Sequence, residues 1–340
     1  MPDGREALRV AVSEALQARW YGGVAPGMAL RAIAALYGDL MRIRRWAYRV
    51  GALRQHRLAS PVVVVGNRTV GGAGKTPLVI ALVGALRARG WRPGVLSRGY
   101  GRSTTGLRRV DAGSTAQDVG DEPLLIHRAT GVPVVVDADR IAAAALLVDA
   151  GCDVLVADDG LQHLRLGRVI EIEVEDARGL GNAQVMPAGP LREPIPAGGA
   201  TFRVVHGRAA DDDEVPMRLE LGDARRIGDD APSSQRALSA FAGPVHAVAG
   251  IGHPARFFGA LRGAGLAVIE HPFPDHHAFT DADFAAMRDA PVLMTGKDAV
   301  KCRHLDLPEA WEVPVTAVLP GHFLDALDLR LRESPRHVDP

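Results

Sequence analysis

The sequence predicts an α/β fold in which a mainly parallel sheet is flanked by helices. Three observations predict it: short valine-rich segments alternate with apolar helical segments, glycines stand at their junctions, and polar residues gather where the apolar strands end. With 340 residues, 47% of them hydrophobic, the chain is long enough for two buried cores. Ligands of such sheets bind at the carboxyl ends of the strands, so we expect function in the polar loops.

The predicted elements follow one another in a regular order. A four-valine strand after Pro61 leads through a glycine loop into a buried helix over 76–90, and a second strand follows at 94–97. "VPVVVDADRIAAAALLVDAG" predicts a strand, a turn and a helix closed by Gly151, and "CDVLVADDGLQH" predicts a further strand. A second α/β portion has strands in "VHAVAGIG", "AVIEHPF" and "PVLMTG", separated by helices in "ARFFGALRGAG" and "DADFAAMRDA".

Residues 206–236 differ from their surroundings, because they are acidic and contain Pro and Gly, with at most a hairpin around "MRLEL". We interpret them as a boundary. The predicted division is an amphipathic helical segment over 1–58, a core with the glycine loop over 59–205, a linker or hairpin over 206–236, and a second, smaller α/β domain over 237–340.

Charge and cysteine content narrow the function classes. Forty basic and forty acidic residues cancel, which argues against a general nucleic-acid binder, and no obligate protein partner is evident. Residues 1–57 nevertheless carry ten Arg and only four acids, which favours a local anionic partner such as a membrane surface. Cys152 and Cys302 are expected to be free thiols in a reducing compartment. Charges interrupt any secretory signal and no apolar run reaches about 18 residues, so we expect a cytoplasmic protein.

Residues 28–50 predict an amphipathic helix. Leu30, Ile33, Tyr37 and Leu40 recur at helical spacing, and arginines cluster near its end around Trp46. Such a helix can lie on an anionic bilayer, or it can pack on its own domain as an ordinary surface helix. Spacing alone leaves both interpretations open.

The glycine loop "GNRTVGGAGKTP" is close to the Walker A pattern G-x-x-x-x-G-K-[ST], but Thr69 stands where the first glycine is expected. The groups that hold phosphates are still present. Gly71, Gly72 and Gly74 allow a close backbone approach, Lys75 can reach the β- and γ-phosphates, and Thr76 can ligate Mg²⁺ at a helix N-terminus. The strand–loop–helix context predicts a P-loop NTPase-type nucleotide site.

Four other motifs carry candidate functional residues, and each has an ordinary structural alternative. Asp158 and Asp159 follow an apolar strand in "VLVADDGLQH", where an acid can serve the metal or cap the next turn. "GDEP" fits acids at a helix N-terminus as well as a site. A rigid "MPAGPLREP" loop can present an Arg to a phosphoryl group or form a stiff surface turn. "HPFPDHHAF" places a carboxylate beside two imidazoles, for proton transfer, metal binding or structure alone.

Taken together, the motifs resemble those of the tetraacyldisaccharide 4'-kinases of lipid A biosynthesis. The resemblance rests on "VGNRTVGGAGKTP", "SRGYG", "GDEP", "DADR", "DDGLQH", "PAGPLREP", "GIGHPARFF", "FPDHHAF" and "GKDAVKC", in the family's order over about residues 62–302. The N-terminal "ALYGDLMRIRRWAY" helix is similar too. In this family the loop also lacks the first Walker glycine, and one departure here is Gly296, where the family usually has a glutamate.

The resemblance implies a kinase that moves the γ-phosphate of ATP to the 4'-hydroxyl of a tetraacyldisaccharide 1-phosphate at the cytoplasmic face of the inner membrane, with residues 28–50 meeting the lipid. It also implies the roles of single residues. The triphosphate would be held by Thr69, Val70, Gly71, Gly72, Ala73, Gly74, Lys75 and Thr76, and Mg²⁺ would be held by Thr76, Glu122, Asp158 and Asp159. Asp121 would be the catalytic base, assisted by His276, Asp275 and Lys75. The acceptor and phosphate side would be lined by Tyr100, Arg140, His163, Arg192 and Glu193.

Two other functions compete. A P-loop nucleotide-dependent switch or metallochaperone would hydrolyse ATP or GTP without a hydroxyl acceptor, and a soluble small-molecule kinase would not need the N-terminal helix. Spacing does not decide whether His276 or its neighbour His277 partners the base, and the motif match favours His276.

Overall fold

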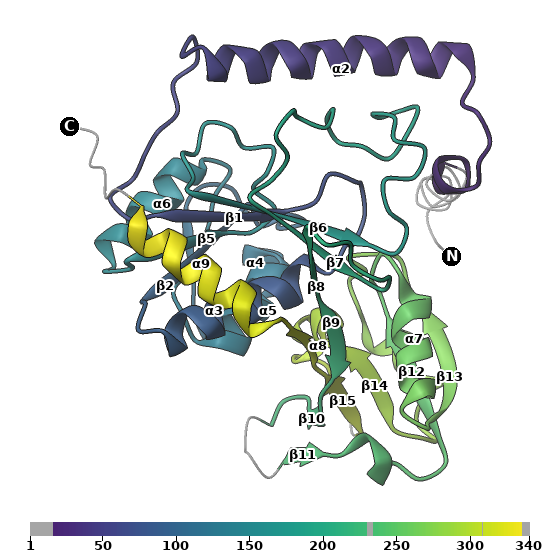
Figure 1. Cartoon of the computed structure of the whole chain (residues 1–340). Helices are drawn as coiled ribbons and strands as arrows, with labels where there is room; N and C mark the ends of the chain where they lie inside the picture. The colour runs from purple at the N-terminus through teal and green to yellow at the C-terminus, as the bar shows by residue number, and fades with distance from the viewer. Residues whose placement is uncertain (1–15, 230–233, 308, 335–340) are drawn as a thin grey trace. The chain divides into compact units, whose positions relative to one another are not determined.

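The computed structural model describes residues 16–229, 234–307 and 309–334 (Figure 1). The chain forms two compact units, each built from separate stretches of sequence: Met1–Lys75, Val154–Met217 and Pro320–Pro340 in the first, and Thr76–Asp153 and Arg218–Leu319 in the second. Mainly parallel sheets flanked by helices confirm the predicted α/β class. The predicted boundaries near 58, 205 and 236 stay a prediction, since compactness does not test independent folding.

In the first unit the strands lie in the order β5-β1-β6-β7-β8, and every neighbouring pair is parallel. All five residues of β1 are buried, as expected for a valine run covered on both faces of a parallel sheet. The strands are β1 (Val62–Gly66), β5 (Val154–Ala157), β6 (Ile170–Asp176), β7 (Phe202–His206) and β8 (Glu214–Pro216).

Two long helices belong to the first unit, α2 (Met28–Arg49) and α9 (Gly321–Glu333) (Figure 1). On α9 the buried residues Phe323, Leu327 and Leu331 recur every four positions and form one apolar face. The Phe323 ring meets Phe202 of β7 edge to face, with 5.0 Å between the ring centroids.

Helix α2 turns its large apolar residues outward. It packs on the first unit through Ala34 and Gly38, and an added Cβ at Gly38 would lie 3.5 Å from Val185. Tyr37, expected on the apolar face, instead belongs to the packed side, where its hydroxyl donates to the Arg192 carbonyl across 2.7 Å. Besides Met28, the exposed large apolar side chains of α2 and its C-cap recur at intervals of three or four residues: Ile33, Leu36, Leu40, Ile43, Trp46 and Val50, all of them more than half exposed.

The second unit contains the strand order β3-β4-β2, in which β2 and β4 are parallel and β3 is antiparallel to β4. Helix α3 begins at Lys75, the last residue of the first unit. Asp139 caps α6 by accepting from the backbone N–H groups of Ile141 and Ala142. The bounds are β2 (Pro93–Ser97), β3 (Arg108–Val110), β4 (Val134–Val136), α3 (Lys75–Ala88), α4 (Ala116–Val119), α5 (Asp121–Thr130) and α6 (Arg140–Asp149).

A six-stranded sheet with the order β11-β10-β15-β14-β12-β13 completes the second unit. Its four strands β15, β14, β12 and β13 are parallel, while β10 pairs antiparallel with β15 and β11. Phe257, Phe258 and Leu261 of α7 pack with Trp311 in its core. The bounds are β10 (Ala224–Arg226), β11 (Gln235–Arg236), β12 (Pro244–Ala249), β13 (Ala267–Pro272), β14 (Val292–Thr295), β15 (Ala310–Val313), α7 (Pro254–Gly263), α8 (Gly296–Cys302), η2 (Leu238–Ala240) and η3 (Asp281–Phe284).

Two expectations about local structure are corrected. The "MRLEL" strand, β9 (Arg218–Leu221), pairs with β16 (Val315–Val318) near the end of the chain rather than in a hairpin of its own; the nearby hairpin is β10 with β11. "DADFAAMRDA" forms only the 3-10 helix η3 instead of an α-helix. Its capping box, Thr280 with Asp283, begins a turn, but Phe284 and Met287 are its only buried large apolar residues, which is too few to support further turns.

Candidate active site

The glycine loop connects the carboxyl end of β1 to α3, as the sequence predicts. Gly71 and Gly74 have φ of 106° and 77°, values that favour glycine. A Cβ on Gly74 would also lie 2.9 Å from Nε2 of His206. These two positions require glycine, whereas Thr69 lies outside the tight turn.

Side chains of the first unit donate hydrogen bonds to the carbonyl groups of this loop. A loop whose carbonyls are tied in this way can direct its N–H groups to the other side, where an anion binds. Four contacts do this: Asn67 Nδ2 donates to Thr69 O (2.6 Å) and Gly71 O (3.2 Å), Arg178 donates to Gly72 O (3.2 Å), and His206 Nε2 donates to Ala73 O (2.9 Å). The Val70 N–H donates to Pro190 O (2.9 Å), so Val70 anchors the loop by its backbone.

Lys75 is buried at the start of α3 and is already paired. Its Nζ donates to Oδ1 of Asn67 across 2.8 Å and lies 3.5 Å from Oδ1 of Asp159. Arg192 donates to both oxygens of Asp159 across 2.8 Å. Burial raises the pKa of Asp159, but the charges of Lys75 and Arg192 outweigh it, so the pKa lies below its ordinary value.

The carboxyl end of β5 carries Asp158, which is 1% exposed, and Asp159, whose φ of 49° is unusual outside glycine. Thr76 is the second residue of α3. In the described parts of the chain, no three His, Cys, Asp or Glu side chains form a metal cage. In proteins, Mg²⁺ is commonly held by one or two carboxylates that share the ion with nucleotide phosphates and water. Carboxylate and hydroxyl donors beside a glycine cradle therefore fit a magnesium–nucleotide complex.

A second polar cluster lies in the second unit, where α5 and α8 are neighbours (Figure 1). Asp121, 4% exposed, opens α5, and Nδ1 of His276 donates to its Oδ2 across 2.9 Å. The Glu122 N–H donates to Oδ1 of Asp121 across 3.0 Å. His277, the other candidate partner, instead contacts Asp283 at 3.2 Å.

Lys297 of α8 lies at the centre of this second cluster. Its Nζ is 3.0 Å from Asp275, 3.2 Å from Glu122 and 3.8 Å from Asp121. It also lies 3.4 Å from Nε2 of His276. Burial lowers the pKa of Lys297, yet the three carboxylates raise it above its ordinary value, so the ammonium stays charged.

The electrostatics of Asp121 and His276 are coupled. Burial raises the pKa of Asp121, but the hydrogen bond from His276 and the charge of Lys297 bring it below the ordinary 3.8. Burial lowers the pKa of His276, and the Asp121 hydrogen bond raises it above the ordinary 6.5. Asp121 is therefore an ionised carboxylate at neutral pH, oriented by an imidazole. His276 has φ of 63°, so backbone strain accompanies this placement.

The other predicted substrate residues are distributed over both units. Tyr100 is 63% exposed, and its ring centroid lies 5.1 Å from that of His276. Arg140 is buried at the start of α6, and the carbonyl of half-buried His163 accepts from Arg168. Glu193 is buried and binds Arg45 across 2.8 Å.

Two residues of these clusters have no assigned role in the sequence analysis. Asn67 lies in the motif "VGNRTVGGAGKTP", and Lys297 lies in the motif "GKDAVKC". The motifs include both residues, but only the tertiary structure shows that Asn67 contacts Lys75 and that Lys297 contacts Asp275. Gly296 begins α8, and an added Cβ would lie 3.0 Å from Glu312 Oε1 and 3.1 Å from Leu125 Cδ1. The side chains of Glu312 and Leu125 thus border the position where the family usually has a glutamate.

Comparison with known proteins gives consistent matches. The profile of the family described as Tetraacyldisaccharide-1-P 4'-kinase matches residues 27–332. A protein named tetraacyldisaccharide 4'-kinase from Stenotrophomonas maltophilia is 49% identical over 325 residues, covering 92% of this chain and 95% of its own. One with the same name from Alkalilimnicola ehrlichii is 52% identical over 301 residues, covering 85% and 88%.

Among solved structures, the fold is similar to LpxK from Aquifex aeolicus in complex with ATP, with a TM-score of 0.76 and 28% identity. The similarity covers 89% of this chain and 98% of that one. The matches span both polar clusters and favour the kinase over the switch or metallochaperone.

Proposed function

Because the chain belongs to the tetraacyldisaccharide-1-P 4'-kinase family and is an ATP-dependent kinase, we propose roles for both polar clusters in its reaction. It moves the γ-phosphate of ATP to the 4'-hydroxyl of a tetraacyldisaccharide 1-phosphate and yields the 1,4'-bisphosphate of lipid A biosynthesis. The observation that carries the assignment of roles is the Asp121–His276 hydrogen bond at the "GDEP" and "PDHH" motifs.

The glycine loop is the triphosphate site. Its tied carbonyls, the two glycines with positive φ and the start of α3 together support an anion cradle over Thr69–Thr76. Lys75 neutralises charge on the transferring phosphoryl group, and Asp159 pairs with both that lysine and Arg192.

Magnesium would be held by the Thr76 hydroxyl with the carboxylates of Asp158 and Asp159, and Glu122 would contribute to the ion's surroundings. When bound, the ion neutralises charge that develops on the phosphates. The Glu122 carboxylate contacts Lys297 of the second cluster, so its role toward the metal rests on the "GDEP" motif.

Asp121 is the general base. Its carboxylate accepts the proton of the 4'-hydroxyl while that oxygen bonds to the γ-phosphorus and the bond from phosphorus to the bridging oxygen of ADP breaks. His276 orients the carboxylate through Oδ2, and Asp275 supports the pair through Lys297. Burial raises the pKa of Asp121, but the His276 hydrogen bond and the Lys297 charge lower it by more, so the carboxylate is ionised and has a free lone pair for the proton.

Tyr100, Arg140, His163, Arg192 and Glu193 contribute to the acceptor and phosphate side. Tyr100 is the best supported, because it is exposed and lies against His276. Glu193, bound to Arg45 and buried, acts by positioning α2.

Helix α2 attaches the enzyme to the cytoplasmic face of the inner membrane. In the part of the chain that the structure describes, no helix is long and apolar enough to span a bilayer. The exposed apolar stripe Ile33 to Val50, flanked by arginines, is the pattern of a helix lying in the interface. This supports peripheral attachment.

One assay tests the kinase function. The protein is incubated with γ-labelled ATP, Mg²⁺ and a tetraacyldisaccharide 1-phosphate, and the label is followed into lipid and into free phosphate. We expect acceptor-dependent labelling of the lipid. Release of free phosphate at the same rate with and without acceptor would contradict the proposal and favour a nucleotide-dependent switch.

A further inference from the structure

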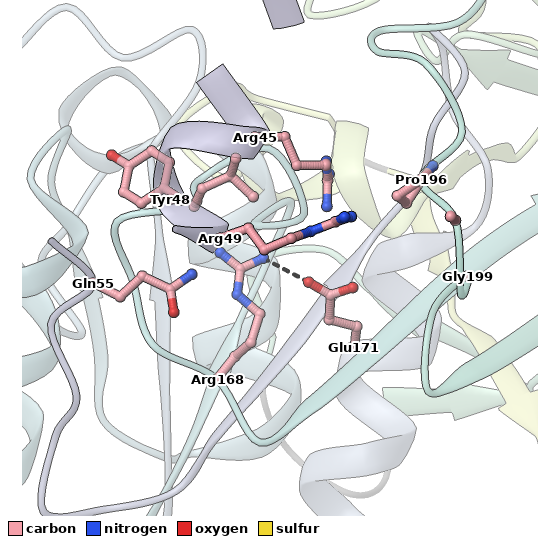
Figure 2. Close-up of a pocket in the computed structure, with 10 residues that line it drawn as sticks. Arg45, Tyr48, Arg49, Gln55, Arg168, Glu171, Pro196 and Gly199 are labelled. Carbon is pink, nitrogen blue, oxygen red and sulfur yellow. Dashed lines mark hydrogen bonds and ion pairs between the residues drawn. The ribbon is translucent and has the colours of Figure 1, made fainter. Parts of the chain in front are cut away.

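A cavity of about 230 Å³ lies at the C-terminal end of α2 (Figure 2). Its walls come from the last turns of α2, the chain just after it, and the segments around β6 and residues 196–199. The volume is below the roughly 300–1,000 Å³ of pockets that enclose a whole small molecule. The cavity therefore suits one polar group of a larger ligand.

The charges that line this cavity do not balance. Arg45 pairs with Glu193 across 2.8 Å, and Arg168 pairs with Glu171 across 3.0 Å. Arg49 also lines it, and its side chain has no hydrogen-bond or ion-pair partner among the described residues. Figure 2 shows the guanidinium groups of all three arginines gathered beside the Glu171 carboxylate, so one positive charge is left over.

A neutral donor lies at the same cavity. Gln55 lines the wall, and within the described ranges its amide has no partner either. The next residue, His56, is fixed by a bridge to Leu166, which holds this stretch in place. A planar guanidinium and an amide, both available, suit a ligand with several acceptor oxygens, such as a phosphate.

The cavity adjoins the apolar stripe of α2. Trp46 is 59% exposed and lies three positions before Arg49. Val50 is 53% exposed and directly follows Arg49. Residues three apart are neighbours on a helix surface, so Trp46 stands beside Arg49. A ligand that carries a charged group next to hydrocarbon fits this combination.

We propose that the cavity binds a phosphate group carried on a lipid. The phosphate belongs either to the head group of an anionic phospholipid or to the 1-phosphate of the acceptor, and the second case rests on the proposed function. The ordinary alternative is that Arg49 only offsets the partial negative charge at the end of α2. That alternative predicts lost stability, and a loss of lipid affinity no larger than that of any other exposed arginine of α2.

Three variants of the full chain separate these ideas. Arg49→Gln removes the unpaired charge, and Gln55→Leu removes a donor without changing charge. Arg31→Gln is the matched control, because Arg31 is exposed on the same helix, lies outside the cavity, and its side chain has no partner among described residues. Thermal unfolding first shows that all three fold.

The first arm measures binding to phosphatidylcholine vesicles with and without phosphatidylglycerol. If the phospholipid head group is the ligand, Arg49→Gln and Gln55→Leu each weaken binding to the anionic vesicles about tenfold, while Arg31→Gln loses only the roughly fivefold of a general surface charge. The second arm measures KM for the disaccharide 1-phosphate in neutral micelles. If the acceptor phosphate is the ligand, the same two variants raise KM and leave kcat unchanged.

The proposal is overturned if Gln55→Leu behaves as wild type in both arms and Arg49→Gln matches Arg31→Gln. Failure of the wild-type protein to label the disaccharide at all would instead count against the proposed function, and the vesicle arm would still decide on the cavity.

Discussion

Nδ1 of His276 lies 2.9 Å from Oδ2 of Asp121, although 155 positions separate the two residues in the sequence. The ring approaches from a loop after β13, and the carboxylate opens α5. Because Asp121 is ionised, the imidazole N–H donates and fixes the carboxylate's orientation. This contact makes the proposed base testable by several independent measurements.

Loss of Lys75 is expected to harm turnover more than loss of His276. Phosphoryl transfer depends chiefly on charge stabilisation, whereas a general base contributes roughly 10²–10⁴-fold, and His276 acts only through that base. Lys75→Ala should therefore abolish measurable labelling of the lipid, and His276→Ala should reduce kcat by about 10²-fold. His277→Ala is the matched control, because both imidazoles are 25% exposed in one loop and His277 contacts Asp283 instead. A larger defect in His276→Ala than in Lys75→Ala would reverse the ordering.

The pKa of His276 should move in opposite directions in two variants. Asp121→Asn removes the hydrogen bond and charge that raise it, so burial dominates and the pKa falls. Lys297→Met removes a repulsive charge, so the pKa of His276 rises. NMR titration of the ring measures both. Shifts of the same sign in the two variants would show that the cluster is not coupled as described.

The Asp121–His276 pair should stabilise the fold within a limited pH window. The pKa of Asp121 is lowered, so its contribution is present above the ordinary 3.8 and is lost as pH falls through its folded pKa. The pKa of His276 is raised, so its contribution is present below the ordinary 6.5 and is lost as pH rises through its folded pKa. The difference in free energy of unfolding between wild type and His276→Ala should then be largest between those values. Denaturant unfolding across pH checks this, and a difference that grows at alkaline pH would contradict it.

Asn67→Ala should weaken ATP binding. Its amide holds two loop carbonyls and its oxygen accepts from Lys75, so the loop loses its support. Each of these hydrogen bonds contributes about 1 kcal/mol. If part of that free energy is lost from the nucleotide-binding form of the loop, the Kd of ATP rises roughly tenfold. Asn182→Ala is the control, because Asn182 also donates to a backbone carbonyl, that of Ala188, which is not part of the glycine loop. Equal ATP affinities in the two variants would remove the role given to Asn67.

Leu36→Glu should reduce binding to anionic vesicles about tenfold, since a buried leucine contributes roughly 1.5–3 kcal/mol. Leu36 is 75% exposed on α2, so the free energy of unfolding should change by no more than about 0.5 kcal/mol. Leu329→Glu, at a 56% exposed leucine on α9, provides the comparison. If both variants bind vesicles alike, α2 is not the attachment surface.

Local sequence determined much of this protein. The order of strands and helices, the glycines of the loop and the resemblance to one kinase family all follow from residues close together in the chain. Gly71 and Gly74 illustrate why: positive φ is a property of a few adjacent residues, so a motif can reveal it. The apolar run of β1 likewise marks a buried strand by itself.

Tertiary structure decided the rest. Asp121 contacts His276 and not His277, and Lys297 lies among three carboxylates. Strand β9 pairs with β16. On α2, Ile33 and Leu40 face outward while Tyr37 packs inward. Each of these depends on contacts between segments far apart in the chain. Helical spacing shows which residues share a face of α2, but only the packing of Gly38 against Val185 fixes which face meets the protein.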